Sequence, residues 1–189
     1  IAGGSYNGTN GQVTANGALT VAMSGAFNQD GATAAVSAKH ITIDAGSLGN
    51  RAGAQIVQTG ADATRITVVG ALDNGGGTLA SNGNTTVAAG SLSNQGGILR
   101  AAEASDLGLT VGGLLDNSSK GVIGAGGTTT IAAGSLSNNA GSVTAAEDLS
   151  VTVGGAASNV GGTLAANGNT TLVAGTLDNS SGTAAAVNG

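Results

Sequence analysis

The amino-acid sequence predicts an all-β protein, a parallel β-helix (β-solenoid) that stacks about nine coils of roughly 21 residues on one another. Three observations predict this fold. A short element ending in asparagine recurs along the chain, the segments between these elements alternate apolar and polar residues, and glycine accounts for 36 of the 189 residues. That glycine content disfavours a helical bundle, because each glycine costs about 1 kcal/mol in a helix interior.

The recurring element sets the length of one coil. Successive copies of its terminal asparagine are separated by 20 to 24 residues. Stacked amides at the strand spacing, about 4.8 Å, can hydrogen-bond from coil to coil. Alternatively, each asparagine tolerates the left-handed backbone conformation of a corner, and both interpretations stay open. The predicted ladder consists of Asn28, Asn50, Asn74, Asn94, Asn117, Asn138, Asn159 and Asn179.

A longer period of 44 residues lies on top of the first, as in the separations between Asn50, Asn94 and Asn138. Residues 76–90 reappear as 161–175, and a different kind of segment, 101–113, reappears in 145–155. Two unlike coils therefore alternate. We expect residues 1–189 to form a single repeat array from inside a longer chain, with irregular coils in 1–64 and regular alternating coils in 65–189.

The strands come from short segments of period-two alternation. Residues 41–43, 66–68, 109–111 and 151–153 each place two apolar side chains on one face and a threonine on the other. Gly-Gly and Asn-Gly pairs between such segments favour tight corners. One coil cannot bury its apolar face alone, so we expect equivalent strands of successive coils to pair in parallel.

Composition excludes several other classes of protein. The chain has no cysteine, so it is not a disulfide scaffold. Its formal net charge is −5, and its five basic residues are scattered, so no dense positive face exists for nucleic acid. No run of residues is long and apolar enough to predict a transmembrane helix.

The sequence offers little for catalysis, and we expect no enzymatic activity, no cofactor and no metal site. His40 is the single histidine, which leaves too few ligands for zinc. Asp73 and Asp116 precede ladder asparagines, but they should lie two coils apart, about 9.6 Å. That separation exceeds the roughly 5–5.5 Å of a retaining glycosidase pair. Serine between the aspartates instead keeps like charges from stacking directly.

The repeated pattern Gly-Gly-Thr-Leu-Ala-x-Asn-Gly-Asn-Thr-Thr, followed by Ala-Gly-x-Leu-Asp/Ser-Asn, resembles the hemagglutinin repeat of filamentous hemagglutinin-like adhesins. Similar repeats build the shafts of contact-dependent growth-inhibition toxins. The resemblance implies that the β-helix is right-handed and continues into flanking repeats of the same parent chain. It also implies export through an outer-membrane two-partner transporter and display on, or secretion from, a Gram-negative cell.

The favoured functional hypothesis is a structural shaft or adhesin segment that supports cell adhesion. The alternative is a receptor-binding segment of a contact-dependent growth-inhibition toxin. Interfaces usually draw on aromatic residues and arginine. The candidate receptor contacts therefore lie in the irregular part of the chain and are Phe27, Lys39, His40, Arg51 and Arg65. Unpaired strand edges at each end also predict end-to-end self-association.

A minor alternative is an ice-binding solenoid, which would need an unbroken array of threonines on one face. Thr42, Thr86, Thr130 and Thr171 share a position, eight residues before their ladder asparagine. By the same count the intervening coils place Ile66, Leu109 and Val151 there. The sequence therefore predicts a broken array.

Overall fold

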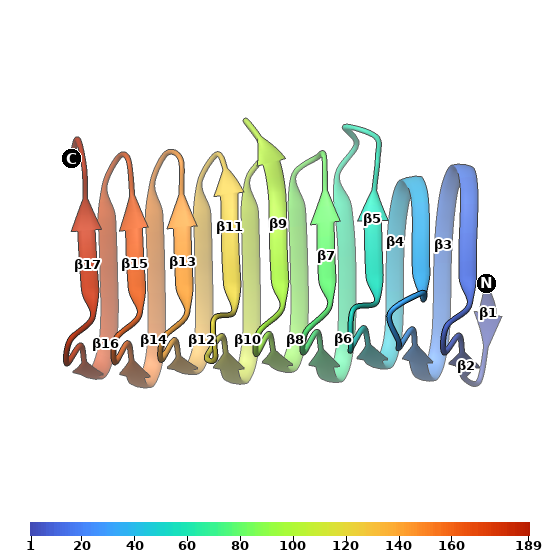
Figure 1. The fold of residues 1–189 in the computed structure, drawn as a ribbon, viewed down its shortest axis with the longest axis horizontal. Helices are drawn as coiled ribbons and strands as arrows, with labels where there is room; N and C mark the ends of the chain where they lie inside the picture. The colour runs from blue at the N-terminus through green and yellow to red at the C-terminus, as the bar shows by residue number, and fades with distance from the viewer.

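The computed structural model describes the backbone of residues 1–189 and every side chain except that of Glu103. The chain forms 17 strands in one continuous sheet that winds into a solenoid of about nine coils, with all strand pairs parallel (Figure 1). The all-β prediction is confirmed. In Figure 1 the chain moves from right to left, rising along the near strands and descending along the far ones, so the winding is right-handed.

Two kinds of strand alternate in all but the first coils. Short strands form the near side of the solenoid in Figure 1, and long strands form the rest of each coil. The short strands are β5 (Gln55–Gln58), β7 (Thr78–Ser81), β9 (Ile98–Glu103), β11 (Val122–Gly126), β13 (Ser142–Ala145), β15 (Thr163–Ala166) and β17 (Thr183–Ala186). The long strands are β6 (Thr64–Asp73), β8 (Thr85–Ser93), β10 (Leu107–Asp116), β12 (Thr129–Ser137), β14 (Leu149–Ser158) and β16 (Thr170–Asp178).

In the first coils the strands are interrupted less often than in the later ones. They contain two very short strands and two strands that run around most of a coil without a break. These are β1 (Ala2–Gly3), β2 (Tyr6–Asn7), β3 (Gln12–Asn28) and β4 (Ala35–Gly49). The termini lie at opposite ends of the rod (Figure 1). Within the described residues no helix has the length and apolarity needed to cross a bilayer.

Each long strand changes register at a glycine corner, so it covers two sides of the coil. In β10 the register against β12 shifts between Val111 and Leu114, on either side of Gly112 and Gly113. The short strand that follows supplies the third side. A coil is therefore three-sided, and its inward-pointing residues face one another across a narrow interior.

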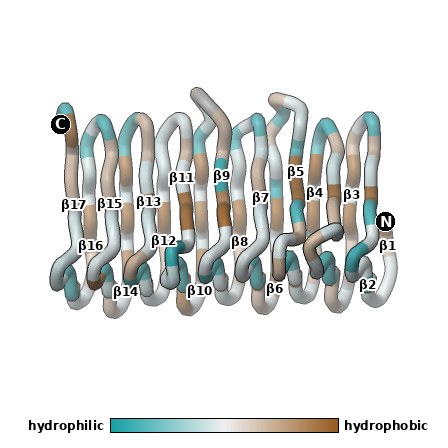
Figure 2. The backbone as a smooth tube through the Cα atoms, in the orientation of Figure 1, coloured by the Kyte–Doolittle hydropathy of each residue, from teal (hydrophilic) through white to brown (hydrophobic). Residues whose placement is uncertain are grey.

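Stacked columns of aliphatic side chains from all three sides fill that interior. The central column joins Ile66, Val87, Leu109, Ile131 and Val151, each at most 2% exposed. The short strands contribute a second column through residues such as Leu99 and Ile123. Small and branched side chains fit because each column advances by only one strand spacing per coil, about 4.8 Å. Figure 2 shows apolar residues along the strands and hydrophilic ones concentrated at the turns.

The central column corrects the predicted register of the threonines. Ile66, Leu109 and Val151 are buried, and the positions paired with Thr42, Thr86, Thr130 and Thr171 are instead Arg65, Gly108 and Ser150. Alternate coils contain one extra residue at the glycine corner. Seven residues separate Val87 from Asn94, whereas eight separate Leu109 from Asn117. Counting back from the asparagine therefore slips by one residue and selects the wrong face.

Candidate functional site

The most ordered feature inside the solenoid is a column of asparagine side chains at the corner that precedes each short strand. From Asn50 to Asn159, each side-chain Nδ2 donates to the Oδ1 of the asparagine one coil further on, at 2.6–2.7 Å. All of its members except the last, which is partly buried, have no exposed surface. We call this column the asparagine ladder, and its members are Asn50, Asn74, Asn94, Asn117, Asn138, Asn159 and Asn179.

The ladder also ties the side chains to the backbone. The Nδ2 of Asn117 donates to Ser142 O at 3.0 Å, on the short strand of the next coil. Asn74, Asn94 and Asn138 make the same bond to Ile98, Val122 and Thr163. Since every donor points toward the C-terminal coil, the seven amides form one directed chain of hydrogen bonds. The hydrogen bonds in such a chain polarise one another, and each is stronger in the dry interior than it would be in water.

The residues with a left-handed backbone conformation are not the ladder asparagines. Among the described non-glycine residues, none of the eight predicted asparagines has a positive φ. The positive φ falls two residues after the ladder position, for example at Ala52, Ala140 and Ser181, or at Gly76 and Gly96. The sequence allowed asparagine to serve either as a hydrogen-bonding ladder residue or as the left-handed residue of the corner. The structure assigns these two roles to different residues. Asparagine provides the hydrogen bonds, and a residue further along provides the turn.

Asn28 is not part of the ladder, so the prediction was wrong for this residue. Its backbone pairs with Gly49, whereas Gln29 N donates to Gly49 O just as Asn50 N donates to Asp73 O. Gln29 therefore occupies the ladder position of this coil. The cause is Phe27, which pairs with Leu48 and takes the core position that leucine holds in later coils. The positive φ of Gly31, two residues after Gln29, follows the same pattern as the other corners.

Gln29 interrupts the chain of amides. Its Nε2 donates to Gly11 O at 2.7 Å, in the preceding coil, and does not reach toward Asn50. As a result the buried Gln29 Oε1 and Asn50 Oδ1 both lack a hydrogen-bond partner among the described residues. Buried acceptors without a donor cost free energy, about 1–3 kcal/mol each.

Replacing Gln29 with asparagine is expected to extend the ladder by one coil. The shorter amide should donate to Asn50 Oδ1 and remove one orphaned acceptor, at the expense of the bond to Gly11. We expect a gain of about 1 kcal/mol in the free energy of unfolding, measured by urea denaturation. Gln12→Asn, at an exposed position, is the matched control. A Gln29→Asn protein that is no more stable than this control would contradict the expectation.

Glycines pack closely against the ladder where each turn re-enters the short strand. A Cβ on Gly141 would lie 2.0 Å from Asn117 O and 2.6 Å from Asn138 Oδ1. Equivalent glycines meet the preceding ladder carbonyl at similar distances, namely Gly77, Gly97, Gly121, Gly162 and Gly182. The sequence pattern predicted glycine only as a source of corners. A glycine recurs three or four residues after the ladder asparagines from Asn74 onward, and this recurrence could have predicted the column of closely packed glycines.

Aspartate and serine share the position just before the ladder. Register pairs Asp73 with Ser93, Ser93 with Asp116, and Ser158 with Asp178, so carboxylates in this column never stack on adjacent coils. Each aspartate accepts a bond from the backbone N–H two residues later, such as Ser118 N to Asp116 Oδ1 at 3.0 Å. These carboxylates therefore fix the turns, and they do not form a close pair suited to acid–base catalysis.

Hydrogen bonding lowers the pKa of three aspartates. The Arg51 side chain lowers the pKa of Asp30, and the Ser180 hydroxyl lowers that of Asp178. Burial alone would raise the pKa of Asp116, but the bonds from Ser118, Gln95 and Ser137 outweigh it and hold that pKa below its usual value.

The depressed pKa values predict a loss of stability in acid. A carboxylate whose pKa is lower in the folded than in the unfolded state stabilises the fold above its ordinary pKa, near 3.8. That contribution is lost as the pH falls through the folded pKa. We expect the urea midpoint to decrease between pH 5 and pH 2, and to decrease less in Asp116→Asn, whose side chain can still accept from Ser118. Identical pH profiles for the two proteins would contradict this assignment.

The predicted receptor contacts do not form one patch. Phe27 is fully buried and stacks on Tyr6 with ring centroids 5.0 Å apart, so its proposed role in receptor contact was wrong. The largest apolar side chain near the end of a narrow core serves packing. Arg51 lies in the turn after Asn50 and pairs with Asp30 at 2.7 Å and with Asp73 at 3.6 Å.

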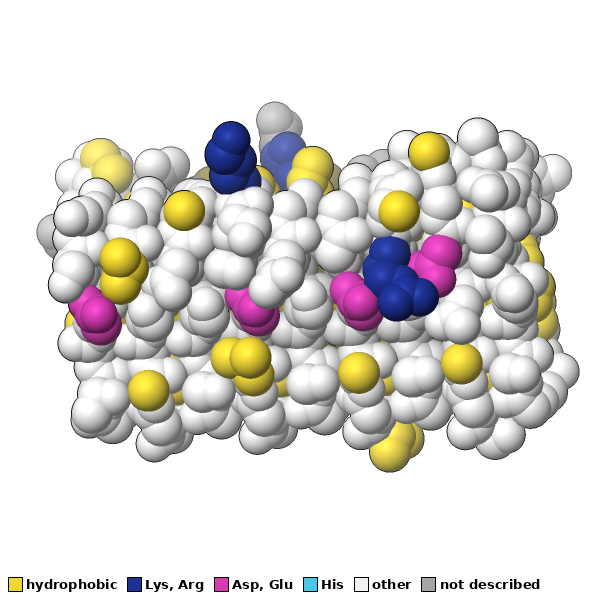
Figure 3. Space-filling model, turned by 60° about the horizontal axis from the view of Figure 1, so that its bottom comes forward, with side chains coloured by type: hydrophobic (Ala, Val, Ile, Leu, Met, Phe, Trp, Pro, Cys, Tyr) yellow, Lys and Arg dark blue, Asp and Glu magenta, His cyan; other side chains and the backbone are white. Residues whose placement is uncertain are grey.

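The other three candidates lie at different places around the coil. Arg65 is on β6 and pairs with Asp44 at 2.8 Å. Lys39 and His40 lie within β4, next to the residues where β5 ends in the following coil. Lys39 is exposed and His40 is partly exposed. Figure 3 shows how sparse the charged side chains are on one face, where carboxylates are isolated except around one basic group.

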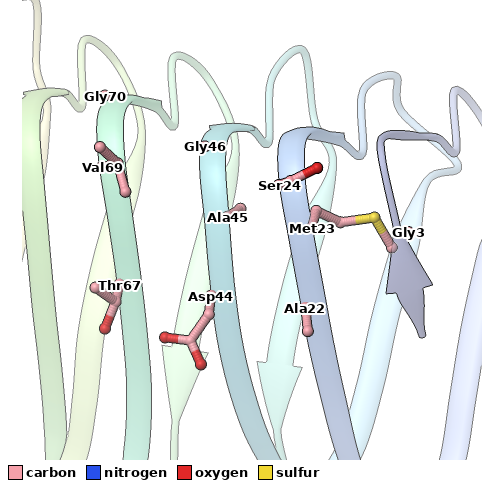
Figure 4. A pocket seen from close by; sticks show the side chains of 10 residues that line it. All are labelled: Gly3, Ala22, Met23, Ser24, Asp44, Ala45, Gly46, Thr67, Val69 and Gly70. Atoms are coloured by element: carbon pink, nitrogen blue, oxygen red, sulfur yellow. The ribbon is translucent and has the colours of Figure 1, made fainter.

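A surface groove of about 670 Å³ crosses β3, β4 and β6 (Figure 4). Met23, Ala45 and the exposed Val69 line it, together with backbone at Gly46 and Gly70. Its one carboxylate, Asp44, is already paired with Arg65. Among the described residues no group of three or more histidine, cysteine, aspartate or glutamate side chains could hold a metal ion.

Comparison with known families gives one match. A family model described as "Haemagglutinin repeat" matches residues 1–76, 36–119, 104–161 and 125–189, which together span the chain. No curated protein and no solved structure matches. The matched segments overlap, as expected when a repeat model finds several alignments along a regular array.

Proposed function

Because the chain belongs to the haemagglutinin-repeat family, we propose that it is a length of shaft in a secreted surface adhesin of the filamentous hemagglutinin type. A solenoid of this family fits a structural shaft of adhesin type. The finer proposal is that the array separates an adhesive or toxic module from the cell that displays it, and so supports adhesion.

The observation that carries the proposal is the continuous ladder. Seven hydrogen-bonded amides run through the core from Asn50 to Asn179, beside the columns of aliphatic side chains. From Asn50 to Asn179, each coil is thereby fixed to the next by side-chain bonds as well as by strand pairing. Quasi-one-dimensional arrays of this kind gain length and stiffness by adding coils. These are the properties that a spacer needs.

The family supports a secreted or surface location. We further propose that the parent chain is exported from a Gram-negative cell by an outer-membrane two-partner transporter. The immediate partners of this segment are then flanking repeats of the same parent chain, which would stack on its terminal coils. A cell-surface receptor would be bound by other parts of that chain.

A spacer should tolerate the removal of whole coils. Deleting residues 95–138 joins Asn94 to Asn139 and removes two coils between equivalent turns. We expect a folded rod that is shorter by about 10 Å, measured by small-angle X-ray scattering, with an unchanged β-type circular dichroism spectrum. Deleting 95–127 should leave the ladder out of register and unfold the protein. If both deletions unfold the protein, the coils are not interchangeable and the shaft proposal is wrong.

A further inference from the structure

Beyond Arg65 the chain contains two basic residues, and they lie on neighbouring coils. After residue 65, the sequence has only Arg100 and Lys120 as lysine or arginine. Arg100 points outward from β9 and is exposed, and it pairs in register with Gly124 of β11. Lys120 is exposed two residues before β11 begins. Two basic side chains project beyond the upper outline of the molecule in Figure 3.

The surface is hollowed on both sides of Arg100. One hollow of about 390 Å³ is lined by Arg100, Val122, Gly124 and Thr144, among others. A second, of about 210 Å³, lies toward β7 and is lined by Arg100, Ala80 and Asn82. Both arise because the residues in register with Arg100 are small, Ala80 on one side and Gly124 on the other. The guanidinium is therefore approachable from either side.

The larger hollow has polar and apolar walls. A Cβ on Gly124 would lie 2.9 Å from Thr144 Oγ1, so the threonine hydroxyl overhangs the glycine floor. Val122 and Ala146 provide the apolar wall. Arg51 pairs with Asp30 and Arg65 pairs with Asp44, in each case across to the neighbouring coil.

We propose that this hollow binds a carboxylate-bearing saccharide of the uronic-acid type. The planar guanidinium of Arg100 would bind the carboxylate with two parallel hydrogen bonds. The Thr144 hydroxyl and the apolar wall suit the hydroxyl and C–H groups of a sugar ring, and the volume lies within the usual range for a small-molecule pocket. An extended acidic peptide fits less well, because β9 and β11 are paired on both sides and offer no free strand edge.

The proposal does not rest on the shaft function, since a spacer can carry a lateral binding site. It is tested by NMR titration of the 189-residue chain with an oligogalacturonate, where we expect saturable shifts with a Kd of about 1 mM. Arg100→Ala should weaken binding at least tenfold, and Gly124→Ala, which fills the floor, several-fold.

Controls separate this site from general charge effects. Lys39→Ala removes an exposed cation elsewhere and should bind like the wild type. All variants should retain the wild-type melting temperature within about 2 °C. Equal binding by Arg100→Ala, equal binding of a neutral oligosaccharide of the same length, or equal binding of an oligoglutamate would each overturn the proposal. The deletion of residues 95–138 removes Arg100, so its rod length tests the shaft and is unaffected by failure of this site.

Discussion

An Asn117→Ala protein is expected to be about 2–4 kcal/mol less stable than the wild type. Asn117 is fully buried, accepts from Asn94 Nδ2 and donates to Asn138 Oδ1, each at 2.7 Å. Truncation breaks both bonds together with the one to Ser142 O, and it leaves the Oδ1 of Asn138 without its donor. Each such buried group costs about 1–3 kcal/mol, and the lost side-chain volume adds to this.

The measurement is equilibrium urea denaturation monitored by circular dichroism. Asn167→Ala is the matched control, because Asn167 is exposed and its side chain makes no hydrogen bond to the described residues. Asn117→Asp provides a sharper test, since it keeps the shape and the acceptor but loses the donor. We expect it to be at least as destabilising as alanine at pH 7, where it also buries a charge. Asn117→Ala and Asn167→Ala proteins of equal stability would show that the ladder contributes nothing.

Gly141→Ala is expected to be among the most destabilising additions of a single methyl group in the array. The added Cβ would lie 2.0 Å from Asn117 O and 2.6 Å from Asn138 Oδ1, and the first of these atoms is backbone that cannot move alone. Relief requires the two coils to separate locally, which also lengthens ladder bonds. We expect a loss of about 3 kcal/mol or more in the free energy of unfolding.

Gly154→Ala is the matched control for this effect. Gly154 lies at a corner of the neighbouring coil, where the nearest atom to an added Cβ is Gly134 O at 3.9 Å, and its φ is not in the left-handed region. A methyl group there should change the stability by less than about 0.5 kcal/mol. If Gly141→Ala melts at the same temperature as Gly154→Ala, close packing against the ladder is not what requires glycine.

The repeat length, the strand type and the parallel stacking could all be predicted from the sequence, because each follows from a pattern that recurs in many coils. Single irregular coils could not be aligned in this way. Phe27-Asn28-Gln29 contains an asparagine one residue before the ladder position, and only burial of Phe27 decides which residue faces inward. The same aromatic side chain suggested an interface, since composition alone does not distinguish a core aromatic from an exposed one.

The extra corner residue explains the other error. Val111 and Leu114 flank a two-glycine corner, whereas β12 turns the same corner with one residue fewer. Because strand side chains alternate with a period of two, a one-residue difference moves the counted position from the outer to the inner face. Arg100 was missed for a related reason. Its significance depends on Gly124, which is 24 residues away in the sequence and adjacent only after stacking.

The single direction of the ladder makes its own two ends chemically unequal. The Oδ1 of Asn50 needs a hydrogen-bond donor from the coil before it, while the Nδ2 of Asn179 offers a donor to whatever stacks beyond it. A cap engineered for one end would therefore fail at the other. A segment that stacks on Asn179 must present an acceptor, whereas the Gln29 coil that covers Asn50 would have to present a donor, so one design cannot serve both ends.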